Sequence, residues 1–471
     1  NYLARLAASL ESNGFDGQIL IVQSNGGVMT VETARRLPIR TALSGPAAGV
    51  IAAAHIATTA GFPNVITCDM GGTSFDVSLV AGGESALAPQ ISIDFGLVVR
   101  TPMIEITTIG AGGGSIAWVD RGGLLQVGPE SAGSEPGPVC YGLGAERPTV
   151  TDANLVLGRI NAERPIGGKL ARLDTGAARR AIKRTIGEPL GLEDIGAAEA
   201  IVRVANARMA GAIRVVSIER GYNPRQFAAM PFGGGGALHA GALIKEVGLA
   251  RAVVPRFPGI TSALGCVIAD MRHDFVQTIN QLLEQLDVRA LDAAMVRLGR
   301  EGLSLLERAD VRFGALDCLF ELDMSYVGQT HTVAAALPVQ LTGGTTGVTR
   351  EIIRTAFETR YRETYSRLLE GIDIRVLNLR VAAIGRRPKF DLALLAPAAD
   401  ASLERAGRGS RQVYVDGAWH EARVYERLDL PVGARIQGPA LLEQPDATIF
   451  VEPDLQGDVD RFGNFIISRR G

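Results

Sequence analysis

Residues 65–80 read VITCDMGGTSFDVSLV, and this stretch predicts a β-hairpin built to hold an anion. A short apolar run leads into an acid, two glycines and two hydroxyl residues, and a second strand-like run follows immediately. The glycines would let backbone N–H groups approach a phosphate closely, and the hydroxyls would add donors. Asp69 or Asp76 would orient a metal-bound water, so both are candidate metal ligands. The candidate phosphate-binding residues in the turn are Gly71, Gly72, Thr73 and Ser74.

Residues 227–247 contain a second glycine-rich segment, in which a strand-like run precedes four glycines and a helix-compatible run follows them. In this order, free N–H groups and the positive end of the helix dipole would face a ligand. A glycine cluster after a strand is more often only a turn, so each segment taken alone is weak evidence for nucleotide binding. The candidate phosphate-binding residues here are Gly233, Gly234, Gly235 and Gly236.

The order of these two segments resembles the second phosphate motif and the adenosine motif of the actin, sugar-kinase and Hsp70 ATPase superfamily. Further motifs resemble the hydantoinase A and 5-oxoprolinase family, collinearly and over nearly the whole chain. These motifs are QSNGGVM at 23–29, LSGPAAGV at 43–50, TIGAGGGS at 108–115, GPVCYG at 137–142, PTVTDAN at 148–154, RHD at 272–274, YVGQ at 326–329 and GPALLE at 438–443. That family includes ATP-dependent N-methylhydantoin and 5-oxoproline hydrolases and related subunits of acetone and acetophenone carboxylases.

The resemblance implies an α/β protein with an actin, sugar-kinase and Hsp70-like ATPase fold that is incomplete at the N-terminus. The family has another acid-Gly-Gly-Thr motif, in a domain that precedes the point where this sequence begins. We therefore expect the larger C-terminal part of a subunit, whether truncated, processed or separately encoded.

Three domains are expected from the pattern along the chain. Alternating strand-like and helix-like runs predict an ATPase-like α/β domain at 1–280, in which the glycine- and proline-rich segment 81–150 forms an inserted loop region. Helices at 288–309 and 351–369 with intervening strands predict an α/β extension at 281–387. Short alternating strands and turn signals predict a small β-rich domain at 388–471.

Composition narrows the class of protein. The net charge of -2 over 471 residues gives no general attraction to nucleic acid or to anionic membranes. The sequence contains no signal-peptide pattern and no stretch long enough to span a membrane, so a cytoplasmic protein is expected. The four cysteines are far apart and the five histidines lack ligand spacing, which argues against a disulfide framework or a zinc site.

The resemblance implies that ATP and Mg²⁺ activate the carbonyl group of a cyclic amide by phosphorylation, since the amide itself is resonance-stabilised. Asp69 would then be catalytic by orienting Mg²⁺ through water. Asp152 follows a glycine-rich loop and is a second catalytic candidate, as a base or metal ligand, with helix capping as the alternative. Ser44 suits the N-cap of the helix that follows it.

The expected function is therefore a subunit of an ATP-dependent hydrolase that opens hydantoin, N-methylhydantoin or 5-oxoproline rings. The alternatives are a subunit of an ATP-dependent carboxylase of the acetone or acetophenone type, and a non-enzymatic actin-like nucleotide-binding protein. The chain offers phosphate-binding features but no persuasive pair of nucleophile and base. The resemblance accordingly implies a hydantoinase B-like partner subunit, and the sequence does not distinguish the possible substrates.

Overall fold

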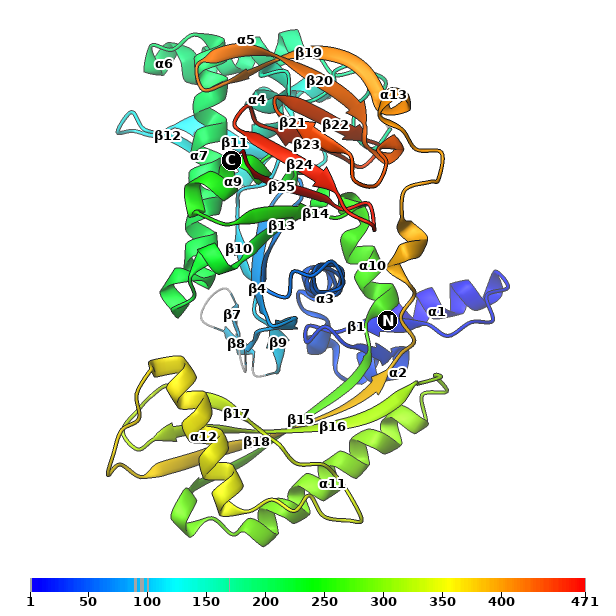
Figure 1. The fold of residues 1–471 in the computed structure, drawn as a ribbon, viewed down its shortest axis with the longest axis vertical. Coiled ribbons are helices and arrows are strands. Elements are labelled where there is room, and N and C mark those ends of the chain that lie inside the picture. The colour runs from blue at the N-terminus through cyan, green and yellow to red at the C-terminus, as the bar shows by residue number, and fades with distance from the viewer. Residues whose placement is uncertain (1, 89–90, 94–96, 100, 169, 471) are drawn as a thin grey trace. The chain divides into compact units, whose positions relative to one another are not determined.

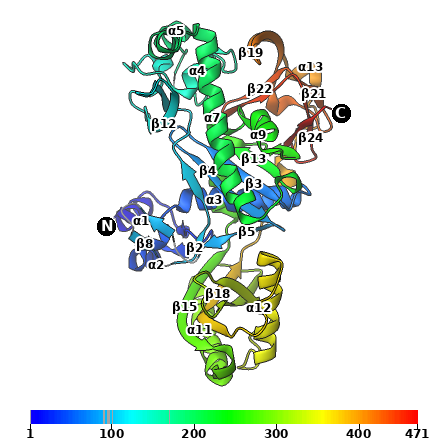
Figure 2. The ribbon, with the colours of Figure 1, turned by 90° about the vertical axis from the view of Figure 1, so that its left-hand side faces the viewer.

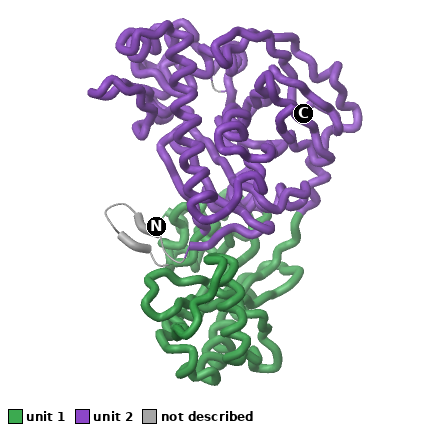
Figure 3. The backbone as a smooth tube through the Cα atoms, turned by 60° about the vertical axis from the view of Figure 1, so that its left-hand side comes forward, with its two compact units in different colours: residues 1–44, 89–103, 268–389 green, residues 45–88, 104–267, 390–471 purple. Residues whose placement is uncertain are grey.

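The structure is a computed structural model that describes residues 2–88, 91–93, 97–99, 101–168 and 170–470. Its backbone divides into two compact units, each assembled from three stretches of chain (Figure 3). Unit 1 comprises residues 1–44, 89–103 and 268–389, and unit 2 comprises residues 45–88, 104–267 and 390–471. The predicted domains at 1–280, 281–387 and 388–471 are continuous stretches instead, and their boundaries stay a prediction.

Unit 1 is built on a six-stranded sheet with the order β1-β2-β15-β18-β16-β17 (Figure 1). The strands are β1 (Leu20–Val22), β2 (Val28–Thr30), β15 (Met271–Leu282), β18 (Ile374–Arg386), β16 (Ala315–Tyr326) and β17 (Val333–Leu337). Helices α11 (Val288–Glu307) and α12 (Arg350–Tyr365) share a hydrophobic core with the three long strands and β17. These two helices confirm the predicted ones, with α12 ending four residues earlier than expected.

Helix α11 forms where the sequence supplies a cap and an apolar stripe. Asp287 accepts a hydrogen bond from the Ala290 N–H at 3.0 Å and so caps the first turn. Leu291, Met295 and Leu298 follow at spacings of four and three residues, which puts all three on the buried face of the helix. The remaining elements of unit 1 are α1 (Tyr2–Ser12), α2 (Val31–Arg36), the 3₁₀ turns at Pro38–Thr41 and Leu283–Gln285, β7 (Ile91–Ile93) and β8 (Leu97–Val99).

Unit 2 is built on a nine-stranded sheet with the order β10-β4-β3-β13-β14-β25-β24-β21, and β5 pairs with β4 beside this path. The strands are β3 (Val65–Met70), β4 (Phe75–Ala81), β5 (Glu84–Ser85), β10 (Thr107–Ile109), β13 (Ala228–Phe232), β14 (Arg251–Val254), β21 (Arg435–Gln437), β24 (Leu455–Val459) and β25 (Phe465–Arg469). β3 and β4 are antiparallel, which confirms the predicted hairpin, whereas β13 runs parallel to both β3 and β14.

Both faces of this sheet are covered, so its central strands are apolar on both sides. On one face α7 (Asp194–Val216) packs against residues such as Ile66 and Val77, and Figure 2 shows this helix running along the sheet. On the other face α3 (Ser44–Thr59) packs against Val65, Val80 and Phe232. The expectation that Ser44 is an N-cap is wrong by one position, because the helix already includes Ser44.

The segment 81–150 is more than an inserted loop, because it supplies β10 to the nine-stranded sheet. It also contains the hairpin of β11 (Ser115–Val119) and β12 (Leu125–Ser131), while residues 89–90, 94–96 and 100 of the predicted loop lie outside the described residues. Other elements of the chain are β6 (Leu87–Ala88), β9 (Met103–Ile104), α4 (Val150–Val156), α5 (Thr175–Ile182), a short π-helix at Lys183–Gly187, α6 (Glu188–Leu190), α8 (Gly233–Gly236), α9 (Ala240–Val247) and α10 (Thr261–Ile268). Single 3₁₀ turns occupy Val139–Tyr141, Ile218–Arg220, Pro224–Gln226, Pro258–Ile260, Leu392–Leu395 and Arg427–Asp429.

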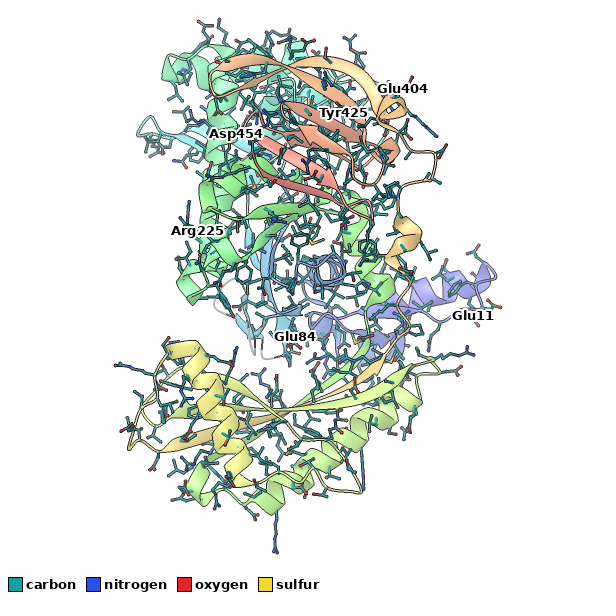
Figure 4. The ribbon with its side chains drawn as sticks, in the orientation of Figure 1. Glu11, Glu84, Arg225, Glu404, Tyr425 and Asp454 are labelled. Atoms are coloured by element: carbon teal, nitrogen blue, oxygen red, sulfur yellow. The ribbon has the colours of Figure 1, made fainter. Side chains whose placement is uncertain are left out.

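The last eighty residues are rich in strands, as predicted, but these strands join the core of unit 2. A four-stranded sheet is formed by β19 (Gly407–Val415), β20 (Ala418–Glu426), β22 (Ala440–Gln444) and β23 (Ala447–Val451), after the short helix α13 (Leu403–Ala406). β25 instead pairs with β14, where Ile467 lies opposite Ala252. Lys245 of α9 lies 3.3 Å from Asp454 in the turn before β24, a residue labelled in Figure 4. Among the described residues, no helix has the length and apolarity that crossing a membrane requires.

Helix α4 is held by a capping box whose acid also binds a neighbouring turn. Thr149 is the N-cap, and Asp152 accepts hydrogen bonds from both the Thr149 N–H and the Thr149 hydroxyl at 2.8 Å. The same carboxylate accepts from the backbone N–H of Val139 at 3.1 Å and of Cys140 at 2.8 Å. Asp152 is 0% exposed, so water cannot take the place of its carboxylate as the acceptor for these donors.

Replacing Asp152 with alanine should therefore destabilise the protein by roughly 3 kcal/mol or more, because it removes a cap and leaves buried N–H groups without acceptors. Asp174, the exposed N-cap of α5, accepts a hydrogen bond from Ala177 at 2.8 Å and provides the matched control. Asp174→Ala should lower stability by only about 1 kcal/mol. Urea unfolding of both variants measures the difference, and equal losses would contradict the structural role of Asp152.

Candidate functional site

Two carboxylates face one another on the β3–β4 hairpin. Asp69 and Asp76 are direct partners in the antiparallel pairing, and side chains opposite one another in such a pair lie on the same face. Thr108 of β10 pairs with Asp76 on the other side and donates a hydrogen bond to its Oδ1. The hydroxyl of Ser74 donates to Asp76 Oδ2 at 3.2 Å. Three adjacent strands thus place a row of oxygen groups at one end of the sheet.

The position of Asp69 makes its negative charge unfavourable. Burial raises the pKa of the Asp69 carboxyl, the charge of Asp76 raises it further, and a hydrogen bond from Ser262 opposes both effects, giving a pKa of about 6. A bound cation would relieve both the desolvation and the repulsion. The carboxylate pair is therefore suited to a cation that keeps water and other ligands in its shell.

The turn between these strands is open to an incoming anion. Gly71, Gly72 and Thr73 are exposed, and a side chain built on either glycine would meet nothing within 4 Å. In the described part of the chain, the backbone N–H groups of Gly72 and Thr73 donate no hydrogen bond. Free, exposed N–H groups in a tight turn are the donors that bind phosphate oxygens.

A second glycine loop, at residues 112–114, holds this turn in place by hydrogen bonds to its carbonyl groups. The N–H of Gly113 donates to the Gly71 carbonyl at 3.0 Å, and the N–H of Gly114 donates to the Gly72 carbonyl at 2.6 Å. A Cβ at Gly112 would lie only 2.6 Å from the backbone of Gly72 and Thr73. The carbonyl groups of the turn are thereby held toward this loop, and glycine is required at 112 because no side chain fits there.

The glycine cluster after β13 lies directly beside the carboxylate pair. Phe232 pairs with Asp69 in the parallel register, and the next residue, Gly233, has a φ of +75°. A Cβ at Gly233 would approach Asp69 Oδ1 and the Met70 carbonyl oxygen to 2.5 Å. Both the backbone conformation and this close approach require glycine at the position. Gly235 and Gly236 likewise lie against β3, at Met70 and at the Cys68 carbonyl, while Gly234 lies toward the carbonyl of Asp446.

The predicted path from this cluster into a helix is wrong in detail. The four glycines themselves form the short helix α8, and the longer helix α9 begins only at Ala240. The residue before it, His239, is buried, and its Nδ1 lies 2.6 Å from Asn206 Oδ1. The glycine cluster therefore does not lead directly into the N-terminus of α9. A ligand at the cluster would meet the N–H groups of the glycines themselves and not the dipole of a long helix.

Helix α10 supplies a side chain to the site that the sequence did not indicate. Ser262 donates a hydrogen bond to Asp69, and α10 approaches α3 closely enough that a Cβ at Gly265 would overlap the Ala48 carbonyl oxygen at 1.9 Å. A Cβ at Gly49 of α3 would lie 2.8 Å from the Ser262 hydroxyl. The absence of side chains at these two glycines therefore lets α10 bring Ser262 to the carboxylate.

The geometry does not support a catalytic role for Asp152. Its carboxylate is fully buried and already accepts the four hydrogen bonds that hold α4 and the 139–141 turn. A general base or a metal ligand needs a free lone pair within reach of its ligand, and none is accessible here. We assign Asp152 the capping role that the sequence offered as the alternative.

Thr108 and Ser262 were missed by sequence reasoning for different reasons. Thr108 belongs to a quoted glycine motif, but only the β10–β4 register shows that its hydroxyl meets Asp76. Ser262 lies almost two hundred residues from Asp69 in a helix without a recognisable motif. The four serine, threonine and glycine residues of the 71–74 turn, by contrast, are together in sequence and in space.

The residues at this site suit a Mg²⁺ ion that is bound together with a phosphate group better than they suit a metal ion held by protein side chains alone. Among the residues that the structure describes, no group of three or more His, Cys, Asp or Glu side chains could hold a metal ion. Mg²⁺ is commonly bound by one or two carboxylates together with waters and phosphate oxygens, as the Asp69–Asp76 pair beside an open glycine turn would allow.

Comparison with known proteins gives matches along almost the whole chain. Residues 1–275 match the Hydantoinase/oxoprolinase family, and residues 283–468 match the Hydantoinase/oxoprolinase C-terminal domain. The caprolactamase subunit alpha of Pseudomonas jessenii is 35% identical over 98% of this chain and 66% of its own length. The acetophenone carboxylase gamma subunit of Aromatoleum aromaticum is 34% identical over 97% of this chain and 63% of its own length.

Solved structures give the same result. The crystal structure of ATP-dependent caprolactamase from Pseudomonas jessenii is similar with a TM-score of 0.83 and 33% identity, over 100% of this chain and 68% of that chain. The nucleotide-free structure of acetone carboxylase is similar with a TM-score of 0.79 and 26% identity, over 99% of this chain and 67% of that one. The chain spans about two thirds of the length of the relatives it matches. With both family regions matched in order, the chain belongs to the hydantoinase/oxoprolinase family.

Proposed function

We propose that this chain is the nucleotide-binding part of a subunit of an ATP-dependent cyclic amide hydrolase. Its substrate class would be hydantoins, N-methylhydantoins or 5-oxoproline. The observation that carries the proposal is the meeting of the Asp69–Asp76 carboxylate pair with the open turn at 71–74 and with Gly233 at one end of a sheet. The similarity to an ATP-dependent caprolactamase supports it, since that relative is named for opening a cyclic amide with ATP.

The arrangement of strands supports an actin, sugar-kinase and Hsp70-like core in unit 2. The two glycine motifs lie on β3, β4 and β13, within the order β10-β4-β3-β13-β14. β4 is antiparallel to both of its neighbours, β10 and β3, and β13 and β14 are parallel to β3. This order brings the β3–β4 turn and the β13–α8 turn together at the same end of the sheet, as the proposed nucleotide site requires.

The roles of the residues follow from their positions. The free N–H groups of Gly72 and Thr73 would bind phosphate oxygens, and glycine at 233 allows the second glycine segment to lie directly against Asp69. Asp69, held by Ser262, and Asp76, held by Thr108, would fix the water shell of the metal. ATP with Mg²⁺ would supply the phosphoryl group that makes the amide carbon electrophilic. The protein contributes alignment and charge stabilisation in this reaction.

A carboxylase subunit of the acetone or acetophenone type is the second candidate. The observation that favours it is the 34% identity to the acetophenone carboxylase gamma subunit, close to the 35% identity to caprolactamase subunit alpha. The nucleotide site would serve both reactions, so the two candidates differ in the molecule that is activated.

Substrate trials separate these candidates. The assembled enzyme is incubated with hydantoins, with 5-oxoproline, or with a ketone plus bicarbonate, and the release of ADP or AMP is measured in each case. Nucleotide release that depends on a cyclic amide supports the hydrolase, and release that depends on ketone and bicarbonate together identifies the carboxylase. Nucleotide binding without stimulation by any substrate would favour a non-enzymatic actin-like protein.

Replacing Asp69 with asparagine should lower turnover of the assembled enzyme at least about 100-fold, because the charge that orients Mg²⁺ is lost while the hairpin keeps its shape. Asp120 provides a control, since it is an acid in another hairpin turn and accepts hydrogen bonds from Gly122 at 2.9 Å and Leu124 at 3.0 Å. Asp120→Asn should leave turnover near that of the unaltered enzyme. Normal turnover in Asp69→Asn would show that Asp69 is only a turn residue.

The ionisation of Asp69 should also be visible in the pH dependence of stability. Its folded-state pKa of about 6 lies above the ordinary value of 3.8, so the folded protein holds the proton more tightly than the unfolded chain. The stabilisation that this proton gives is present below pH 3.8 and is lost as the pH rises to about 6. Asp69→Asn avoids this loss and should gain stability relative to the unaltered protein over the same range, by at most roughly 3 kcal/mol.

Thermal unfolding at a series of pH values measures this difference. Asp120→Asn should behave in the opposite way, since hydrogen bonds from Leu124 and Gln126 hold the pKa of Asp120 below its usual value. Adding Mg²⁺ with ATP at neutral pH should stabilise the unaltered protein and so reduce the difference in stability between it and Asp69→Asn. A stability difference independent of pH would exclude the raised pKa.

The working enzyme is expected to be a hetero-oligomer with a hydantoinase B-like subunit that carries the hydrolysing or carboxylating site. The support is that the relatives are named as subunits, and that the assigned site of this chain contains phosphate-binding groups only. Co-expression with the partner should give substrate turnover that the partner-free protein lacks. If the protein, shown free of any partner by mass spectrometry, opened a cyclic amide as fast as the complex, this division of roles would be wrong.

A further inference from the structure

A small cavity lies in unit 2 on the side of α10 that is turned away from Asp69. Its volume is about 160 Å³. Ile260, in the turn before α10, and Leu264, in the helix itself, both line it, and their spacing of four residues places them on the same side of the helix. Ser262 lies two residues from each of them, and residues two apart on a helix point to roughly opposite sides. The cavity is therefore a different place from the carboxylate pair that Ser262 contacts.

The walls of the cavity are almost entirely apolar and come from segments far apart in the sequence. Besides α10, they are contributed by α3, by the 392–395 turn and by the turn between β24 and β25. The apolar side chains that matter for its shape are Ile56, Leu264, Leu392, Leu395 and Phe462. A cavity of about 150 Å³ with such walls can hold a molecule the size of benzene. The space thus suits an apolar body of about six carbon atoms.

One cationic side chain, Arg256, lies on this apolar lining. Its Nη2 donates to the Leu428 carbonyl oxygen at 3.3 Å, and its guanidinium carbon lies 5.6 Å from the centre of the Phe257 ring. Among the described residues, no carboxylate forms an ion pair with Arg256, and burial lowers the pKa of its guanidinium. A half-buried cation without a counter-ion is unfavourable, so an anion at this point would be stabilised.

The position of Arg256 is enforced by its surroundings. A Cβ at Gly463 would lie 2.6 Å from Arg256 Nη1, so the absence of a side chain there makes room for the guanidinium. The acids in the adjoining turns are engaged with other donors. Asp460 accepts from the backbone N–H groups of Phe462 and Asn464 at 2.8 Å, and Asp446 accepts from the Gly259 N–H at 2.8 Å. Neither of these two acids forms an ion pair with Arg256 among the residues that the structure describes.

We propose that this cavity is a binding site for a small monocarboxylate, with its carboxylate on Arg256 and its apolar body among Leu264, Leu395 and Phe462. The single cation fits a single negative charge, because a second carboxylate would enter apolar surroundings without a partner. The volume is too small to enclose a long-chain fatty acid. The site is independent of the proposed nucleotide chemistry, since none of its lining residues belongs to the carboxylate pair or to the glycine turns.

Isothermal titration calorimetry with hexanoate tests the proposal on the unaltered protein. Hexanoate should bind with one site per chain, and hexanamide, which has the same body without the charge, should bind at least about tenfold more weakly. Absence of hexanoate binding at millimolar concentrations would overturn the proposal. So would equal affinity for hexanamide, because the charge of Arg256 would then play no part.

Variants locate the site. Arg256→Gln should weaken hexanoate binding at least about tenfold, and Leu395→Trp, at a partly exposed position, should abolish it by filling the cavity. Arg251→Gln is the matched control, since Arg251 also lies over an aromatic ring, at 5.9 Å from the centre of Phe62, but lines no part of the cavity. Thermal unfolding confirms that each variant is folded. Undiminished binding in folded Arg256→Gln or Leu395→Trp would place hexanoate elsewhere and refute the assignment.

Discussion

The parallel pairing of β3 with β13 is the constraint on which the site depends. It sets Phe232 opposite Asp69, so that the glycine cluster begins at the level of the carboxylate pair. Gly233 can follow only because it has no Cβ, which would otherwise lie 2.5 Å from the Asp69 carboxylate. Any residue with a side chain at 233 would have to separate the two strands or displace the carboxylate, and the two glycine turns would no longer be adjacent.

The electrostatic character of the site follows from the same pairing. Asp69 and Asp76 are held opposite one another on a partly buried face, and neither has a cationic partner in the described hydrogen bonds. Folding thus places like charges together at the expense of stability, which is a common property of sites that bind a metal or an activated substrate. The hydroxyls of Thr108 and Ser262 orient the carboxylates without neutralising them.

Local sequence predicted the parts of this arrangement that are local. The β3–β4 hairpin, the strand before the glycine cluster and the helices α11 and α12 follow from apolar periodicity and turn residues, and the family follows from collinear motifs. The pairing of segments that are far apart in the sequence could not be predicted from local sequence. The donation from Gly113 and Gly114 to the 71–72 turn, and the entry of β10 into the sheet, depend on register between distant segments. Asp152 shows the same limit, because only burial and its four donors distinguish a cap from a catalytic acid.

The pairing of β14 with β25 affects how the protein can be made. Ala252 lies beside Ile467, so one edge of β14 finds its neighbour only when β25, about two hundred residues further along the chain, has been synthesised. At ribosomal rates of about 5–20 residues per second, the interval is on the order of 10–40 s. During that time an apolar strand edge is open to other chains, and such edges are sites of aggregation. We therefore expect the yield of soluble protein to depend on chaperones or on slow expression at low temperature, more than the stability of the finished fold would suggest.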